Sequence, residues 1–156
     1  MTTLQVAPPA DRQVVVFTLG ADRYAVDVRR VQEIIRWVEP RSVSSSNPLV
    51  RGVINLRGRI IPVCDLGLAI GGDAVAGEDS CIVVIEAAAG ICGVTVDGVD
   101  EVRTLVAAQI DMVPAFAAGC TFVDGVAKLQ DALIVLIDPD ALFAVIGADA
   151  ALLVAA

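Results

Sequence analysis

Arg57 and Arg59 flank Gly58 in the stretch whose residue types are best suited to do chemistry. Mainly apolar runs on either side, residues 50–56 and 60–64, predict two strands joined by a tight turn, and Gly58 can adopt the positive φ of such a turn. Asn-Gly or Asp-Gly would serve a purely structural turn equally well. Guanidinium groups on a rigid hairpin suit recognition of a carboxylate. The alternative is a turn that is merely solvated.

The rest of the chain offers little for catalysis. It contains no histidine, which removes Ser-His-Asp and Cys-His nucleophiles and a phosphorelay histidine. The single lysine, Lys128, lies outside any phosphate-binding loop, and the glycines lack dinucleotide-binding spacing. Neighbouring carboxylates, such as Asp138 with Asp140, are more typical of helix caps than of an acid–base pair. We therefore expect a binding protein with no catalytic residue and no cofactor.

The sequence also predicts a cytoplasmic protein without metal or membrane insertion. No uninterrupted apolar run reaches the roughly 18 residues of a spanning helix, and the N-terminus shows no export signal. Four cysteines stand singly within apolar runs: Cys64, Cys81, Cys92 and Cys120. Because zinc ligands usually come in close pairs and cytosolic disulfides are rare, we expect reduced core thiols and no metal site.

Charge is distributed unevenly along this chain of net charge −8. Residues 23–59 hold eight arginines against three carboxylates, whereas residues 60–156 hold two cations against fourteen carboxylates. Such polarity can provide one basic and one acidic surface for two partners. The acidic excess would repel phosphate, so we expect no nucleic-acid partner. The other interpretation is that the acidic residues only keep a hydrophobic protein in solution.

The elements that must position these residues are mainly strands. Short Val- and Ile-rich runs alternate with Gly, Asn, Pro or Asp about every eight to twelve residues. Helices are expected over residues 28–35 and 139–146, the second with Asp138 as N-cap and Pro139 at its first position. Loops are expected over residues 44–48 and 67–80.

The sequence also contains an internal repeat. The matching segments are residues 14–17 with 82–85, 26–28 with 94–96, 31–34 with 99–102 and, after a small change of register, 63–66 with 136–139. Valine-rich strands can match by chance, but Glu33 and Glu101 coincide as well. The repeat predicts an all-β fold of two small five-stranded barrels, SH3- or OB-like, packed together with short helices.

Together these segments resemble the CheW family of bacterial chemotaxis coupling proteins. The motifs that carry the resemblance are Val31 with Glu33, Asn55-Leu56-Arg57-Gly58 and Val96-Asp97-Gly98-Val99. The resemblance implies a CheW-like domain over residues 13–147, made of two barrel subdomains at roughly 13–80 and 81–147 that can exchange strands at their seam. A flexible N-terminal tail, 1–12, and a C-terminal tail, 148–156, would flank it.

The resemblance also implies a function. A non-catalytic adaptor would couple the cytoplasmic tip of a chemoreceptor to the regulatory domain of the histidine kinase CheA, at receptor arrays on the inner face of the membrane. The receptor-binding residues carried over are Val31, Glu33, Gly52, Asn55, Arg57, Gly58, Gly98 and Val99. Glu33 and Arg57 would form a salt bridge beside the receptor groove. Val31 and Val99 can equally be plain core, and Asn55 would satisfy backbone groups of the hairpin.

The chain departs from the family after Asp65-Leu66, where Gly67 replaces a frequent basic residue, and in alanine-rich stretches such as residues 87–89. These departures weaken the case for specific contacts there. Two alternatives stay open. One is a coupling protein of a related pathway such as pilus motility. The other is a small-ligand-binding β-barrel, which would need polar groups converging in a cleft.

Overall fold

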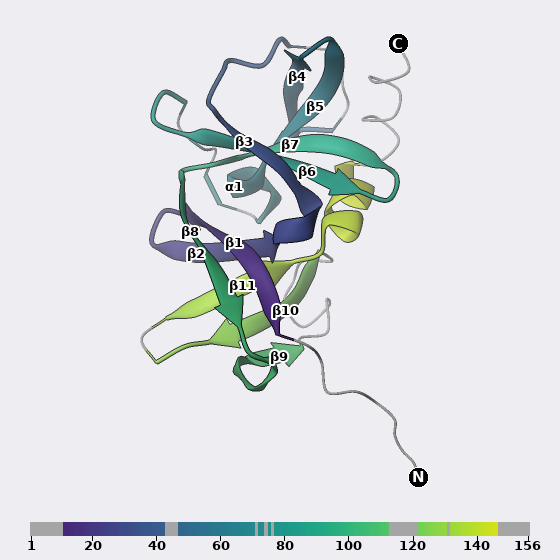
Figure 1. The fold of residues 1–156 in the computed structure, drawn as a ribbon. Helices are drawn as coiled ribbons and strands as arrows, with labels where there is room; N and C mark the ends of the chain where they lie inside the picture. The colour runs from purple at the N-terminus through teal and green to yellow at the C-terminus, as the bar shows by residue number, and fades with distance from the viewer. Residues whose placement is uncertain are drawn as a thin grey trace.

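Two mixed sheets, packed one above the other, make up most of the computed structural model (Figure 1). The structure describes residues 11–42, 47–70, 72–73, 75, 77–112, 122–130 and 132–146. The C-terminal tail, most of the N-terminal tail, Cys120 and most of the expected loop at 44–48 therefore lie outside the described residues. No helix in the described part of the chain is long and apolar enough to cross a membrane.

The lower sheet in Figure 1 has six strands. Their order is β8 (Gly98–Leu105), β1 (Arg12–Leu19), β2 (Asp22–Asp27), β11 (Leu133–Ile137), β10 (Val123–Lys128) and β9 (Ile110–Met112). The upper sheet has five strands, in the order β3 (Val31–Arg36), β6 (Cys81–Ala87), β7 (Gly90–Val96), β5 (Arg59–Asp65) and β4 (Val50–Leu56). One pair in each sheet is parallel, β2 with β11 and β5 with β7.

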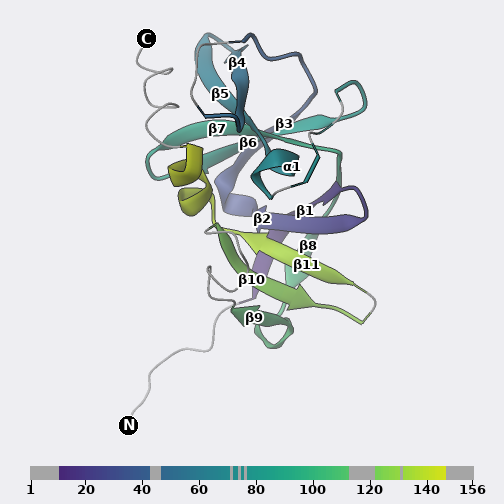
Figure 2. The ribbon, with the colours of Figure 1, turned by 180° about the vertical axis from the view of Figure 1, so that it is seen from behind.

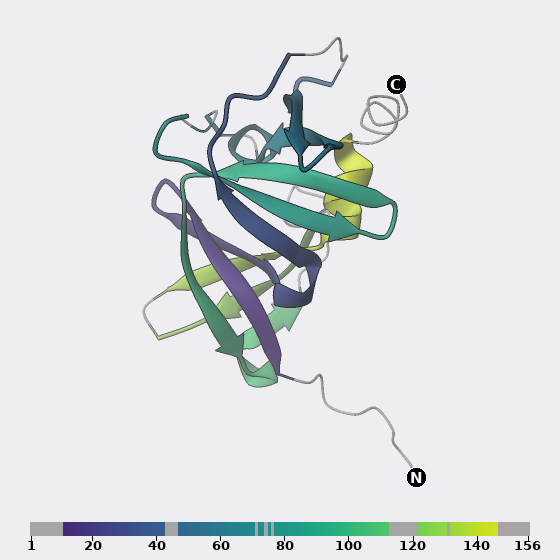
Figure 3. The ribbon, with the colours of Figure 1, turned by 45° about the horizontal axis from the view of Figure 1, so that its top comes forward.

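Each sheet combines strands from both halves of the chain. The β1–β2 hairpin continues into β8 to β11, and the β6–β7 hairpin continues into β3, β4 and β5. Figures 2 and 3 show the resulting crossing, with β8 running from the upper sheet down beside β1. The two sheets thus repeat one strand plan, in which β1, β2, β8, β10 and β11 correspond to β6, β7, β3, β4 and β5.

The prediction of a mainly β fold in two packed units is confirmed, but two closed five-stranded barrels are not observed. Among the described residues the sheets are open, and one has six strands. In the five-stranded sheet the edge strands β3 and β4 are linked through a single bridge after β3, where Arg41 and Val53 exchange backbone hydrogen bonds of 2.8 and 3.0 Å. The five-stranded sheet thus curls until its edges meet at this one bridge, without a continuous ladder of backbone hydrogen bonds.

The helices are short. They are the 3₁₀ turns η1 (Val28–Arg30) and η2 (Ala107–Gln109), the single turn α1 (Leu66–Ala69), and helical residues 139–146, yellow in Figure 1. The helix at 139–146 is confirmed, and the Asp138 carboxylate caps it by accepting from the Asp140 N–H at 3.0 Å. The helix expected over 28–35 is wrong beyond its first turn. Residues from Val31 onward pair with β6 because their β-branched side chains pack better on a sheet.

Three apolar clusters form the core. The largest lies between the sheets and includes Phe17, Val26, Ile85, Val94 and Leu142. The six-stranded sheet holds a second cluster around Val14, Val16 and Ile134. The five-stranded sheet holds a third around Ile61, Val63 and Ile82. Central strands such as β1, β6 and β7 are therefore buried on two faces, which explains their continuous apolar runs in the sequence.

Candidate functional site

The β4–β5 hairpin ends in a two-residue turn with Arg57 at φ +53° and Gly58 at φ +85°. Positive φ at both positions is the type I′ geometry, which favours Asn-Gly. The Asn55 side chain accepts a hydrogen bond from the Gly58 N–H at 2.8 Å, which confirms its expected role. An arginine in the left-handed region costs about 1 kcal/mol. The turn thus carries a guanidinium at the expense of local stability.

Arg57 binds Glu33 through two parallel contacts, Nη1 to Oε2 at 2.5 Å and Nη2 to Oε1 at 2.9 Å. The Glu33 carboxylate raises the pKa of Arg57 by accepting these hydrogen bonds. The Glu33 side chain is 22% exposed and the Arg57 side chain 75% exposed. The ion pair expected from the resemblance is therefore present, and its guanidinium stays accessible to a partner.

This ion pair spans the opening of the five-stranded sheet. Glu33 lies on β3 and Arg57 follows β4, and these two strands are the opposite edges of that sheet. In the other repeat the matching residue, Glu101, instead contacts Arg103 on its own strand at 3.4 Å. Only one of the two sheets therefore presents a hairpin arginine held across its edges in the described residues.

The elements that carry this pair, and the chain after β3, also expose basic and apolar side chains. Arg36, Arg41 and Arg59 are exposed and make no ion pair within the described residues. Ile34 on β3 and Ile60 on β5 are exposed as well. Unneutralised guanidinium groups beside apolar side chains suit an acidic partner surface with apolar residues.

The other candidate residues lie apart from the hairpin tip. Val31 and Val99 are partly buried at equivalent places on β3 and β8, and both pack against the cluster between the sheets. Gly98 pairs with Thr18, whose hydroxyl donates to the Gly98 carbonyl at 3.4 Å. The structure therefore brings together Glu33, Asn55, Arg57 and Gly58, and places the remaining candidates at the seam or along the strands.

The backbone requires glycine at position 52. It lies at a bulge of β4 with φ +148°, and a Cβ atom there would lie 2.2 Å from the Arg41 carbonyl oxygen. Only glycine lets the chain after β3 approach this closely. Asp97 of the Val96-Asp97-Gly98-Val99 motif is structural too, since its carboxylate accepts from the Gly20 N–H at 2.5 Å and fixes the β1–β2 turn.

The role of Asp65 was not predicted from the sequence. Its side chain is fully buried at the end of β5. It accepts hydrogen bonds from Arg51 Nη1 at 2.7 Å, from the Leu68 N–H at 3.0 Å and from the Val75 N–H at 2.9 Å. An aspartate before a short helix is an N-cap signal. Nothing in the sequence indicates that the N–H groups of Leu68 and Val75 both lie against it.

The described residues contain no cluster of three or more potential metal ligands. Cys64, Cys81 and Cys92 are free thiols, and Cys64 and Cys92 are buried. Burial raises the pKa of Cys92 to about 12 and that of Cys64 well above its usual value. Both thiols are therefore neutral near pH 7 and poorly nucleophilic.

Two carboxylates, the half-buried Asp27 and the exposed Asp140, make the stability of the fold depend on pH in acid. A side-chain hydrogen bond from Arg29 lowers the pKa of Asp27, and the Ala88 N–H, followed by Arg30, lowers that of Asp140. A carboxylate whose pKa is lower in the folded state than in the unfolded state stabilises the fold above its ordinary pKa. This stabilisation is lost as the pH falls through the folded-state pKa. We expect Tm to fall below about pH 4, and to fall less for Asp140→Asn. Thermal unfolding from pH 7 to 3 tests this, and a variant with the wild-type acid dependence would contradict it. Asp79→Asn is the control.

Known proteins are similar to this chain in sequence and in fold. A family model for the CheW-like domain matches residues 13–146. The chemotaxis protein CheW of Klebsiella aerogenes is 31% identical over 130 residues, which cover 81% of this chain and 78% of the relative. The probable chemotaxis protein CheW of Rhizobium etli is 29% identical over 146 residues, covering 90% and 93%.

A solved structure agrees. The crystal structure of scaffolding protein TtCheW from Thermoanaerobacter tengcongensis matches with a TM-score of 0.79 and 34% identity, covering 88% of this chain and 96% of that one. The family model, the sequence relatives and the solved structure point the same way. The chain belongs to the CheW family and is a scaffold of chemotaxis signalling.

Proposed function

We propose that this scaffold binds the cytoplasmic tip of a chemoreceptor at the surface around Glu33 and Arg57, and a CheA-type histidine kinase elsewhere on its sheets. It performs no reaction itself and acts in the cytoplasm, at receptor arrays. The receptor-side residues are Val31, Glu33, Gly52, Asn55, Arg57, Gly58, Gly98 and Val99. Glu33, Asn55, Arg57 and Gly58 form the polar part, and Gly52 shapes the strand that carries the hairpin.

The observation that carries this proposal is the bidentate ion pair across the sheet opening. Arg57 keeps a strained backbone where Asn would be preferred, and its side chain stays largely exposed. Backbone strain of this kind is concentrated at functional sites. A guanidinium held by one carboxylate and open to solvent on its other side is oriented for a second acceptor on a partner.

Arg57→Asn tests whether the receptor and the kinase bind at two separate surfaces. Asn-Gly is the preferred type I′ pair, so this variant removes the guanidinium while it retains or stabilises the turn. We expect affinity for a receptor fragment to fall about tenfold, because a charge-assisted contact is lost. Affinity for the kinase regulatory domain should change by under about 1 kcal/mol, as for sites that share no partners.

Two titrations of the same variant measure this, with circular dichroism as the folding check. Lys128→Gln is the control, since it removes one exposed positive charge from β10 of the six-stranded sheet, away from the hairpin of Arg57. An equal loss of both affinities in folded Arg57→Asn would mean that receptor and kinase share one surface. It would contradict the proposal that the scaffold links them through separate surfaces.

A charge swap tests whether Glu33 and Arg57 act as a pair. Glu33→Arg and Arg57→Glu each place like charges together and should weaken receptor binding while the fold stays intact. The double variant restores opposite charges and should recover part of the loss. The same receptor titration measures all three variants. A double variant that binds no better than the worse single variant would show that the residues act separately.

A further inference from the structure

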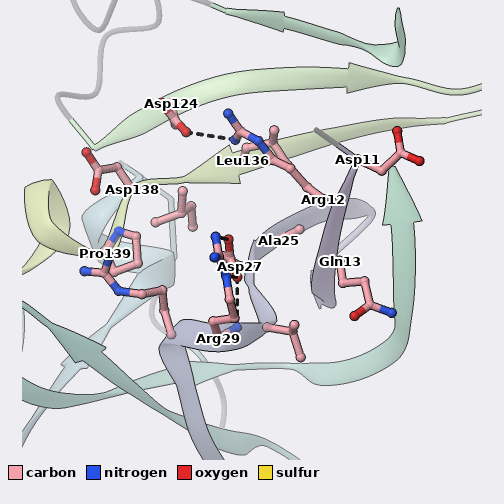
Figure 4. Close-up of a pocket in the computed structure, with 13 residues that line it drawn as sticks. Asp11, Arg12, Gln13, Ala25, Asp27, Arg29, Asp124, Leu136, Asp138 and Pro139 are labelled. Atoms are coloured by element: carbon pink, nitrogen blue, oxygen red, sulfur yellow. Dashed lines mark hydrogen bonds and ion pairs between the residues drawn. The ribbon is translucent and has the colours of Figure 1, made fainter. Parts of the chain in front are cut away.

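The parallel strands β2 and β11 diverge at their carboxyl ends and leave a cleft of about 920 Å³ (Figure 4). β2 leads into η1 and β11 into the helix at 139–146. Ala25, Leu136 and Pro139 supply apolar lining, and aspartates and arginines surround it. A crevice where parallel strands end and the chain turns away on both sides is a common ligand position in sheets of other folds.

The charges in this cleft are incompletely matched. Four aspartates and three arginines line it. Arg12 binds Asp124 at 3.2 Å and Arg29 binds Asp27 at 2.9 Å, as the dashed lines in Figure 4 show, while Arg30 binds Asp140 outside the lining. Asp138 makes no ion pair within the described residues. One of its oxygens caps the helix, and no hydrogen bond of its other oxygen is found among the described residues.

The internal repeat supplies a filled copy of the same crevice. The bulges of β4 and β10 align Arg51 with Asp124, and the strand ends align Asp65 with Asp138. In that copy Asp65 accepts from the Arg51 guanidinium and from the backbone N–H of Val75, and the Val75 side chain is buried in the core. A segment of the chain itself thus occupies the equivalent place.

The open copy differs at the residue that would supply the guanidinium. Asp124 stands where Arg51 would be, and Arg12 only compensates Asp124. Within the described residues Asp138 therefore receives none of the three groups that its counterpart Asp65 receives from outside its own helix cap: a guanidinium, a backbone N–H and an adjacent apolar side chain. These three groups together describe an extended peptide that carries a basic residue next to a small apolar one.

We propose that this cleft is a docking site for an extended segment of a partner protein, with an arginine or lysine directed to Asp138 and a neighbouring Val- or Ala-sized side chain against Leu136 and Pro139. This site lies on the six-stranded sheet, away from the hairpin of Arg57, so it is independent of the function proposed above. Its partner is recognised by positive charge and small apolar side chains, whereas the hairpin surface favours an acidic partner.

Two end-blocked synthetic heptapeptides provide the probe: Gly-Ala-Val-Arg-Val-Ala-Gly and the same peptide with Glu in place of Arg. We expect saturable changes in the amide resonances of Asp27, Arg29 and Asp138 of the ¹⁵N-labelled full chain with the arginine peptide. The glutamate peptide should bind at least about tenfold more weakly. Asp138→Asn keeps the helix cap and should lower affinity for the arginine peptide about tenfold.

Asp79→Asn is the matched control, because it makes the same charge change at an exposed position outside the lining and should leave affinity unchanged. Asp124→Asn is a second variant, which frees Arg12 to repel a cation and should also weaken binding. Equal affinity for both peptides, no saturable change at millimolar peptide, or free arginine binding as tightly as the peptide would each overturn the proposal. None of these measurements involves a receptor or a kinase.

Discussion

Replacing Asp65 with alanine is expected to lower the free energy of unfolding by about 3 kcal/mol, because one guanidinium and two backbone N–H groups lose their acceptor. The fully buried carboxylate holds Arg51 and the N–H groups of Leu68 and Val75. Alanine would leave these donors without this acceptor, and the Val75 N–H, whose bond to Asp65 is buried, would lose its partner away from water. Urea unfolding followed by Trp37 fluorescence measures the change, because Trp37 packs against the core of the five-stranded sheet.

Asp138→Ala is the matched control for this effect. Asp138 is the repeat counterpart of Asp65, but it is only half-buried and serves as a helix cap. Its loss should cost about 1 kcal/mol, the usual value for a cap. Equal destabilisation by the two substitutions would show that Asp65 acts only as a cap, and that its bonds to Arg51 and Val75 add no stability.

Gly52→Ala is expected to cost roughly 3 kcal/mol, because it combines a conformation almost exclusive to glycine with a steric clash. The added Cβ atom would lie 2.2 Å from the Arg41 carbonyl oxygen at φ +148°. The chain after β3 would have to move away from β4 and break the bridge between Arg41 and Val53. Equilibrium unfolding measures the loss, and hydrogen exchange at Val53 reports the broken bridge.

Gly58→Ala separates backbone strain from the clash. Gly58 also has positive φ, at +85°, but a Cβ atom there meets nothing within 4 Å. This variant should cost only about 1 kcal/mol. If Gly52→Ala is no worse than Gly58→Ala, close approach of the chain at residue 41 is not what requires glycine. Weak receptor binding by Gly52→Ala would then report a direct contact instead of a displaced hairpin.

The sequence by itself determined the features that depend on neighbouring residues. The β4–β5 hairpin follows from two β-rich runs around Gly58, and the helix at 139–146 follows from Asp138 and Pro139 at its start. The Asn55 hydrogen bond to Gly58 is equally local. The pairing of Glu33 with Arg57 came from the family resemblance, because no local rule connects residues 24 positions apart.

Tertiary structure decided what depends on long-range packing. Val31 to Arg36 carries apolar residues that fit a helix as well as a strand, and pairing with β6 selects the strand. The exchange of strands between the two halves, and the closed crevice at Asp65 beside the open one at Asp138, have the same origin. Repeated sequences share their local preferences, but each copy meets different neighbours, and burial against those neighbours determines which crevice is filled.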